Sequence, residues 1–246
     1  MQLPTTKTLP TKRDPRILVI YGAPKVGKTS KLAELDNCLI IDNEHGTDYI
    51  SALKIQVNTI LQLREVAAEL KKSPMTYRYV ALDTVSTLED WAEELATRNY
   101  QASPTGKNFV GKSVLTLANG AGYFWLRQAF KELLQLFSGV TGTLILTAHL
   151  REKFLEKSGK EVSTKDIELT GKIRTIVCAL ADTVGYIYRQ DSTLMVSFEG
   201  KEEVLCGSRC DHLKGKTLPF DWSQIFIDST TSTSPAPLIE TNPPVA

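Results

Sequence analysis

The sequence predicts an α/β fold, with a mostly parallel central sheet flanked by helices and an antiparallel extension. Four continuous apolar runs have the length and composition of strands buried on both faces; they span 16–22, 37–42, 77–83 and 142–149. Helix-forming segments separate these runs, and parallel strands need such crossovers. Shorter segments after residue 181 are typical of antiparallel strands.

The predicted elements follow one another in a regular order. The strand at 16–22 ends in glycine and leads into a helix at 27–35. The other predicted helices lie at 59–72, 86–100, 121–137 and 170–181. We expect Ser86 to be the N-cap of its helix, because Glu89 stands three residues later as in a capping box. The antiparallel strands are expected at 182–189, 193–198 and 202–206.

The remaining segments are predicted to lie outside regular structure. Residues 101–113 and the charged stretch 150–166 are expected to be long loops. Residues 1–15 form a polar, flexible lead-in to a core at 16–228. The tail at 229–246 is rich in Ser, Thr and Pro, so we expect it to be disordered.

Composition places the chain among cytoplasmic globular proteins. Hydrophobic residues make up 42% and charged residues 23%, which are ordinary globular values. The net charge of +1 means that any affinity for nucleic acid must come from a local patch. No apolar run approaches the ~20 residues that span a bilayer, and the N-terminus lacks the apolar core of a signal peptide. We therefore expect a cytoplasmic protein with no membrane partner.

The cysteines do not form a recognisable framework. The four of them are scattered along the chain, which fits reduced thiols better than disulfides. Cys206, Cys210 and His212 lie near one another in sequence, but they lack the usual short cysteine spacing and a fourth ligand. A structural zinc site is therefore disfavoured there.

The segment "GAPKVGKT" at 22–29 matches the phosphate-loop pattern G-x-x-x-x-G-K-[ST]. In this motif backbone N–H groups surround the phosphates, Lys28 reaches the β- and γ-phosphates, and the Thr29 hydroxyl binds Mg²⁺. The predicted strand before it and helix after it supply the context that the motif requires. The residues expected to contact the nucleotide are Gly22, Ala23, Pro24, Lys25, Val26, Gly27, Lys28, Thr29 and Ser30.

A second segment, "GKNFVGKS" at 106–113, satisfies the same pattern but not its context. No buried strand precedes it, and the following residues are too few for a phosphate-binding helix. Two interpretations stay open for it. It is either a glycine-rich loop whose lysines contact a nucleic-acid backbone or a flexible surface loop.

Two acidic residues at strand ends complete the predicted site. Asp83 ends the apolar run at 77–83 and is expected to hold Mg²⁺ with Thr29, the alternative being a simple helix N-cap. Phosphoryl transfer to water also needs a group that orients the attacking water. Glu44 is the candidate, because it lies just beyond the strand at 37–42, whereas Asp42 is within that strand and is expected to face away.

The stretch "CLIIDNEHGTD" at 38–48 resembles the strand-end signature of RecA-type recombinases. The resemblance implies a RecA-like P-loop NTPase fold over the core and assigns Glu44 to activation of the hydrolytic water. It also implies that Asp48 contacts adenine, with Tyr49 as a stacking candidate, although the aromatic register departs from the recombinase pattern.

The segment "LILTAHLREK" resembles the recombinase strand that ends in a γ-phosphate sensor and leads into a DNA-binding loop. His149 takes the sensor position, where recombinases usually have an amide. In this respect the chain is similar to the compact RecA-fold ATPases of phages, some of which act in single-strand annealing and recombination. If the protein is phage-encoded, its location would be the host cell cytoplasm.

The resemblance implies ATP and Mg²⁺ as cofactors, DNA-stimulated hydrolysis and assembly of several copies. RecA-fold ATPases often take a cation from a neighbouring subunit, and Arg209, Lys214 or Lys216 could supply it. The alternative for this segment is a solvated basic loop.

We expect the protein to hydrolyse ATP and to act on single-stranded DNA in recombination, annealing or replication. The basic residues placed to reach a DNA backbone are Lys107, Lys112, Arg151, Lys153, Lys157 and Lys160. Acidic residues alternate with the last four, which favours a solvated loop instead. The rival function is a nucleotide switch or loader that does not act on DNA; a small-molecule kinase is disfavoured because no acceptor-binding lid is recognisable.

Overall fold

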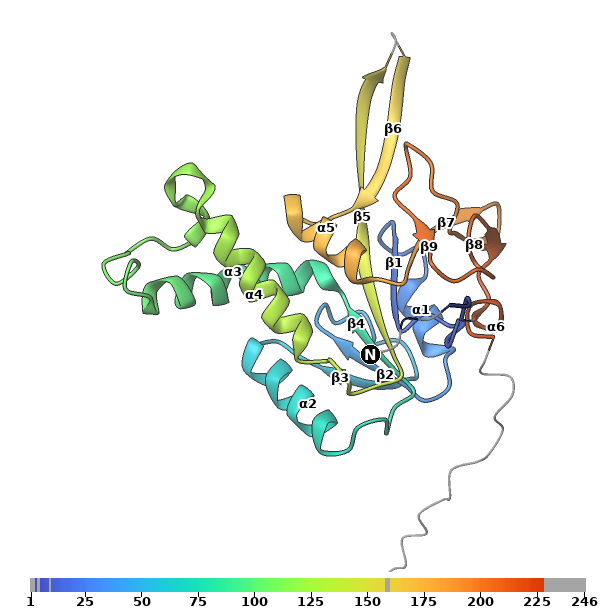
Figure 1. Cartoon of the computed structure of the whole chain (residues 1–246), viewed down its shortest axis with the longest axis horizontal. Helices are drawn as coiled ribbons and strands as arrows, with labels where there is room; N and C mark the ends of the chain where they lie inside the picture. The colour runs from blue at the N-terminus through green and yellow to red at the C-terminus, as the bar shows by residue number, and fades with distance from the viewer. Residues whose placement is uncertain (1–2, 4, 9, 158–159, 228–246) are drawn as a thin grey trace, which may run out of the picture.

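The computed structural model describes residues 3, 5–8, 10–157 and 160–227, and it is an α/β structure built on one large sheet (Figure 1). The predicted disordered tail at 229–246 lies outside the described residues. The strands are β1 (Ile17–Gly22), β2 (Cys38–Asp42), β3 (Leu53–Gln56), β4 (Tyr79–Asp83), β5 (Thr143–Lys157), β6 (Lys160–Ile167), β7 (Thr183–Gln190), β8 (Thr193–Ser197), β9 (Gly207–Ser208) and β10 (Thr217–Pro219).

Most of the helices connect the parallel strands, and a short one follows β10. They are α1 (Lys28–Ala33), α2 (Ile60–Lys72), α3 (Val85–Ala102), α4 (Gly122–Gln135), α5 (Gly171–Leu180) and α6 (Trp222–Ile225), with short 3₁₀ helices at Val114–Thr116 and Ala118–Gly120. No helix in the described part of the chain is long and apolar enough to cross a membrane.

The sheet runs in the order β10-β8-β7-β1-β5-β4-β2-β3. Neighbours from β7 to β3 pair in parallel, whereas β8 and β10 add an antiparallel edge. The register pairs Gly22 with His149 and Asp42 with Asp83. The carboxyl ends of β1, β5, β4 and β2 therefore meet at one edge of the sheet, where the predicted site residues lie.

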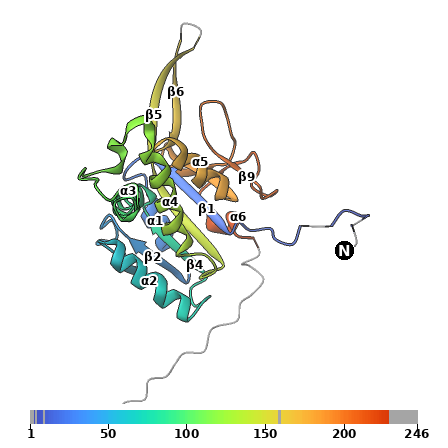
Figure 2. The ribbon, with the colours of Figure 1, turned by 60° about the vertical axis from the view of Figure 1, so that its left-hand side comes forward.

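Alternating side chains along each strand divide the core between the two faces of the sheet. Val19 and Tyr21 of β1 belong to the larger cluster, which includes the buried residues of α2, α3, α4 and α5. Leu18 and Ile20 belong to the smaller cluster, together with Leu32 of α1 and residues of α6. Figure 2 shows α2, α3 and α4 together on one side of the sheet. Both faces are thus covered, as a parallel sheet requires.

The predicted loop at 150–166 is wrong, because this stretch forms a hairpin. Strand β5 continues past His149 and pairs with β6 in antiparallel register over Leu150↔Ile167 and beyond. The hairpin projects from the body of the molecule (Figures 1 and 2). Its residues are charged because a two-stranded ribbon outside the core exposes both faces, and the register sets Glu152 opposite Lys165.

The predicted N-cap of α3 is also wrong. The helix begins at Val85 with Thr84 as N-cap, and the Ser86 hydroxyl donates to the Glu168 carbonyl at 3.4 Å. Glu89 does not complete a capping box, since its carboxylate accepts the Thr170 N–H at 3.0 Å. Tertiary contacts with the segment before α5 have replaced the local ones that the sequence pattern indicated.

The edges of the sheet differ from the prediction as well. Residues 202–206 make only isolated bridges, between Val204 and each of Lys165 and Lys201. Three short strands that the sequence did not indicate, β3, β9 and β10, complete the sheet instead. Edge strands of two to four residues carry too little apolar periodicity to be recognised.

Packing of α6 against the second face predicts a specific loss of stability. Trp222 is buried, and its indole N–H donates to the Lys31 carbonyl at 2.6 Å. Trp222→Ala should lower the free energy of unfolding by about 3 kcal/mol through cavity formation. Denaturant unfolding measures this change, and the exposed neighbour Gln224→Ala should change it by less than about 0.5 kcal/mol. Equal effects would contradict the packing described.

Candidate functional site

The segment 22–29 forms a tight loop between β1 and α1, as expected of a phosphate loop. Gly27 has a φ of 119°, a conformation that L side chains rarely adopt. A Cβ atom on Gly22 would lie 2.5 Å from the Ile187 carbonyl oxygen, so the close approach of β7 also requires glycine. The structure therefore requires glycine at both positions of the motif. The loop ends at α1, so Lys28 and Thr29 lie in the first turn of that helix.

Lys28 folds back over this loop. Its side chain is buried, and Nζ donates to the carbonyls of Gly22 at 2.9 Å and Ala23 at 3.0 Å. Burial lowers the pKa of the Lys28 ammonium, while the charges of Asp83 and Glu44 oppose that change. A cation held by two carbonyls beside a loop of backbone N–H groups forms a site for an anion.

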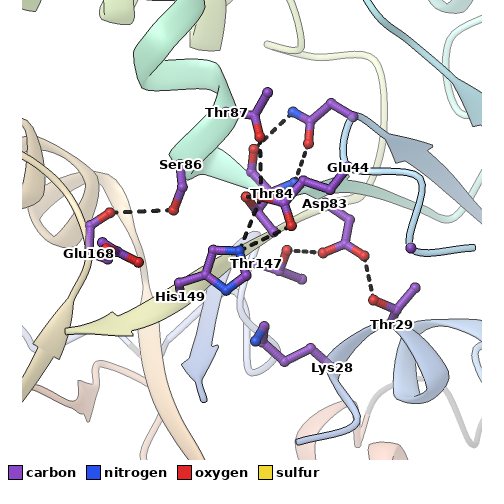
Figure 3. Close-up of polar contacts among 12 residues, drawn as sticks. Lys28, Thr29, Glu44, Asp83, Thr84, Ser86, Thr87, Thr147, His149 and Glu168 are labelled. Carbon is purple, nitrogen blue, oxygen red and sulfur yellow. Dashed lines mark hydrogen bonds and ion pairs between the residues drawn. The ribbon is translucent and has the colours of Figure 1, made fainter. Parts of the chain in front are cut away.

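Asp83 joins three elements at the centre of the site (Figure 3). The Thr29 hydroxyl of α1 donates to one carboxylate oxygen at 2.6 Å, and the Thr147 hydroxyl of β5 donates to the other. Burial raises the pKa of Asp83, with the charges of Glu44 and Asp42 adding to the rise and the two hydroxyls opposing it. A buried carboxylate beside a hydroxyl and further carboxylates is the hard oxygen set that fits Mg²⁺.

Glu44 is held at the same edge by four hydrogen-bonding contacts. It accepts from the hydroxyls of Thr84 at 2.6 Å and Thr87 at 3.1 Å, and both its oxygens contact His149 Nε2, at 3.1 and 3.0 Å (Figure 3). Burial alone would raise the pKa of Glu44, but the hydrogen bonds from His149 and Thr84 lower it to about 2. The same contact with Glu44 raises the pKa of His149.

Asp42 is the register partner of Asp83 and so shares its face of the sheet, contrary to the expectation that it faces away. Its carboxylate organises the turn that presents Glu44. It is fully buried and accepts the N–H groups of Glu44 at 3.0 Å, Gly46 at 3.2 Å and Thr47 at 2.9 Å, and also the Thr47 hydroxyl at 2.6 Å. His45 takes a φ of 57° within this turn. The acidic cluster thus separates into a structural acid and an acid that faces the site.

His149 links Glu44 to the phosphate loop. The ring lies between Glu44 and Lys28 in Figure 3, and its Nδ1 atom is buried with no hydrogen-bond partner among the described residues. The His149 carbonyl accepts the Glu168 N–H at 2.9 Å, which joins the two strands at the base of the hairpin. His149 therefore carries one nitrogen that contacts Glu44 and one that is buried without a hydrogen-bond partner among the described residues.

Several residues of the site were not indicated by the sequence. Asn43 binds the backbone of Thr84, which follows the cis peptide bond Asp83–Thr84. Its Nδ2 atom donates to the Thr84 carbonyl at 2.9 Å, and its Oδ1 atom accepts from the Thr84 N–H. Thr147 could have been found, because it lies two residues before His149 and so shares its face of β5. Thr84 and Thr87 carry no comparable signal.

The residues expected to contact adenine and the basic segment at 209–216 make their contacts outside the group formed by Lys28, Asp83, Glu44 and His149. Asp48 accepts from the Gln56 side chain at 2.5 Å on β3, and Tyr49 is fully exposed. Arg209 donates to the Ala179 carbonyl at 2.9 Å and pairs with Asp182 at 3.6 Å, next to the first residue of β7, at the edge opposite the phosphate loop. The side chains of Lys214 and Lys216 are exposed.

The second motif at 106–113 is not a phosphate loop. It follows α3 rather than a strand and leads into a 3₁₀ helix capped by Ser113. The Phe109 ring packs edge-on against Tyr100, with centroids 5.3 Å apart. Lys107 and Lys112 are exposed on this loop.

A phosphate loop with its lysine, a hydroxyl bound to a strand-end aspartate and a glutamate beside them define a P-loop nucleotide-binding protein. The chain belongs to the family described as an AAA domain, whose model matches residues 14–217. It is also similar to a crystal structure of the RadB recombinase, with 12% identity, a TM-score of 0.40 and coverage of 86% of this chain and 90% of that one. Comparison with curated proteins gave no match.

The Glu44–His149 pair predicts a pH window for stability. The lowered pKa of Glu44 stabilises the fold at pH values above its ordinary 4.5, and this contribution is lost as pH falls toward 2. The raised pKa of His149 stabilises the fold below its ordinary 6.5, and this contribution is lost as pH rises through the folded value. The pair should therefore contribute most between pH 4.5 and 6.5.

Thermal unfolding of the wild type, Glu44→Gln, His149→Gln and the double variant measures this coupling. The coupling between the two sites should peak near pH 5.5, midway through that window, and decline on both sides. A coupling that does not change with pH would show that the pair is not ionic.

Proposed function

We propose that this protein is a RecA-like ATPase that hydrolyses ATP and acts on single-stranded DNA in recombination, annealing or replication. The observation that carries the proposal is the meeting of three groups at one sheet edge: the phosphate loop, the Thr29–Asp83 pair, and Glu44 in contact with His149. His149 stands where β5 leaves the sheet and becomes the projecting hairpin. The nucleotide site and the proposed DNA element thus share one strand.

In the proposed reaction, the loop N–H groups and Lys28 bind the phosphates. Thr29 and Asp83 would hold Mg²⁺, which supplies charge neutralisation at the β- and γ-phosphates when bound. Glu44 orients the attacking water and accepts its proton. His149 ends the strand beside the phosphate loop and would contact the γ-phosphate through Nε2, the nitrogen that contacts Glu44.

The hydrogen bonds and low pKa of Glu44 indicate that it would activate water poorly in the arrangement described. A carboxylate that already accepts hydrogen bonds from Thr84, Thr87 and His149, with a pKa of about 2, is a weak base for water. If His149 exchanges Glu44 for the γ-phosphate, Glu44 gains freedom to bind water. Movement of the hairpin on DNA would change the position of His149 directly, since both belong to β5.

The hairpin has features suited to single-stranded DNA. Phe154 is 63% exposed on it, and Lys153 beside it is exposed. An exposed aromatic ring stacks on bases regardless of sequence, while a lysine contacts the backbone. Arg151 is half-buried at the hairpin base near Asp166, so it is less available than the sequence suggested. Lys107 and Lys112 offer a second basic loop.

We also propose that several copies assemble, with a cation completing the neighbouring site. Lys214 and Lys216 are the better candidates, because Arg209 is already bound to Ala179 and Asp182. Their exposure leaves them available to a second copy.

The second candidate function is a nucleotide switch or loader with slow turnover. The contacts of Glu44 favour this function. Both carboxylate oxygens are bound to His149, so the protein would hydrolyse ATP slowly until His149 moves away from Glu44. Stimulation by DNA separates the two functions.

An ATPase assay with and without single-stranded DNA tests the proposal. Wild type should be stimulated by DNA, and Phe154→Ala should need ~10-fold more DNA for half-maximal stimulation, since one stacked base contributes ~1–3 kcal/mol. The basal rate should not change. Leu61→Ala, at a similarly exposed residue of α2, is the matched control. Indifference of the wild type to DNA would favour the switch; an unchanged response of Phe154→Ala would exclude the hairpin contact.

A further inference from the structure

The β7–β8 hairpin places an arginine beside the phosphate loop. Strand β7 pairs in parallel with β1, with Ile187 opposite Gly22, so Arg189 lies two residues beyond the start of the loop. Its Nη2 atom is 3.8 Å from the position that a Cβ atom on Gly27 would occupy, and Leu194 Cδ2 is 3.6 Å from the same position. This contact links two segments that are far apart in sequence.

The Arg189 side chain is positioned but not neutralised. It stands opposite Leu194 across the hairpin, and Nη1 donates to the Ser192 carbonyl at 3.3 Å. No acidic group among the described residues lies within ion-pairing distance of it. An exposed guanidinium without an acidic partner among the described residues, next to a loop that binds phosphate, is suited to an anionic ligand.

The sheet order indicates which part of a nucleotide Arg189 would meet. Asp83 and Thr147 belong to β4 and β5, on one side of β1, and mark the magnesium end of the site. Strand β7 lies on the other side of β1. Arg189 therefore flanks the loop on the side away from the magnesium end. Because Lys28 and Mg²⁺ serve the β- and γ-phosphates at that end, the α-phosphate is the phosphate left for Arg189.

We propose that Arg189 binds the α-phosphate of the nucleotide within the same subunit. The inference rests on the proposed ATP binding and adds a nucleotide-binding residue that the motif does not contain. A guanidinium contacts phosphate oxygens through two N–H groups, which one ammonium cannot reproduce. ADP and ATP share the α-phosphate, so both depend on Arg189 equally. A subunit-crossing cation near the γ-phosphate would instead distinguish them.

Equilibrium binding of ATP and ADP to the full chain tests this proposal. Arg189→Ala should raise both dissociation constants by a similar factor, roughly 10- to 100-fold, and Arg189→Lys should recover part of the loss. The ATP concentration that gives half-maximal turnover should rise by the same factor as the dissociation constants. Gln190→Ala is the matched control, because the adjacent side chain points to the opposite face of β7.

Two results would overturn the inference. Unchanged dissociation constants for both nucleotides would exclude the contact, and weakened ATP binding with normal ADP binding and a lower turnover rate would assign Arg189 to the γ-phosphate. Thermal unfolding of each variant establishes that it is folded. If the wild type binds neither nucleotide, the proposed function fails; if the wild type binds and hydrolyses ATP while Arg189→Ala behaves identically, only this inference fails.

Discussion

The buried carboxylate of Asp83 is the interaction on which the site depends. Its two oxygens accept hydrogen bonds from the hydroxyls of Thr29 on α1 and Thr147 on β5. This one side chain therefore holds the phosphate-loop helix against the neighbouring strands β4 and β5. A carboxylate with a raised pKa in a buried site is costly unless it is hydrogen-bonded or bound to a cation. The three elements therefore converge around a group that gains from Mg²⁺.

The second constraint is the parallel register of the sheet. Because Gly22 pairs with His149 and Asp42 with Asp83, four strands end together. Asp42 uses its buried carboxylate to fold the next turn, and that turn directs Glu44 back toward His149. A surface ion pair contributes little to stability, but this one joins the proposed base to the strand that forms the hairpin. Breaking this contact frees the Glu44 carboxylate.

Sequence patterns were sufficient where each residue has a local reason. The glycines and lysine at 22–29 satisfy a motif whose context is a buried strand and a helix, and the apolar runs determined the four central strands. They were insufficient where contacts are long-range. Ser86 has an N-cap pattern, yet Thr84 is the N-cap, two residues earlier, and the Ser86 hydroxyl donates instead to the Glu168 carbonyl of a distant segment. The charges of the β5–β6 hairpin lie on a ribbon without a core, so its sequence pattern is that of a loop. Arg189 approaches Gly27 only through the pairing of β7 with β1.

Single-turnover hydrolysis by Glu44→Gln tests the central claim most directly. Glutamine keeps the size of the side chain and can still bond to Thr84 and His149, but it cannot accept a proton from water. The variant should bind ATP with a dissociation constant close to that of wild type and hydrolyse it at least ~100-fold more slowly, in line with the contribution of a positioned general base. Hydrolysis at the wild-type rate would contradict the assignment of Glu44 and the coupling through His149 that depends on it.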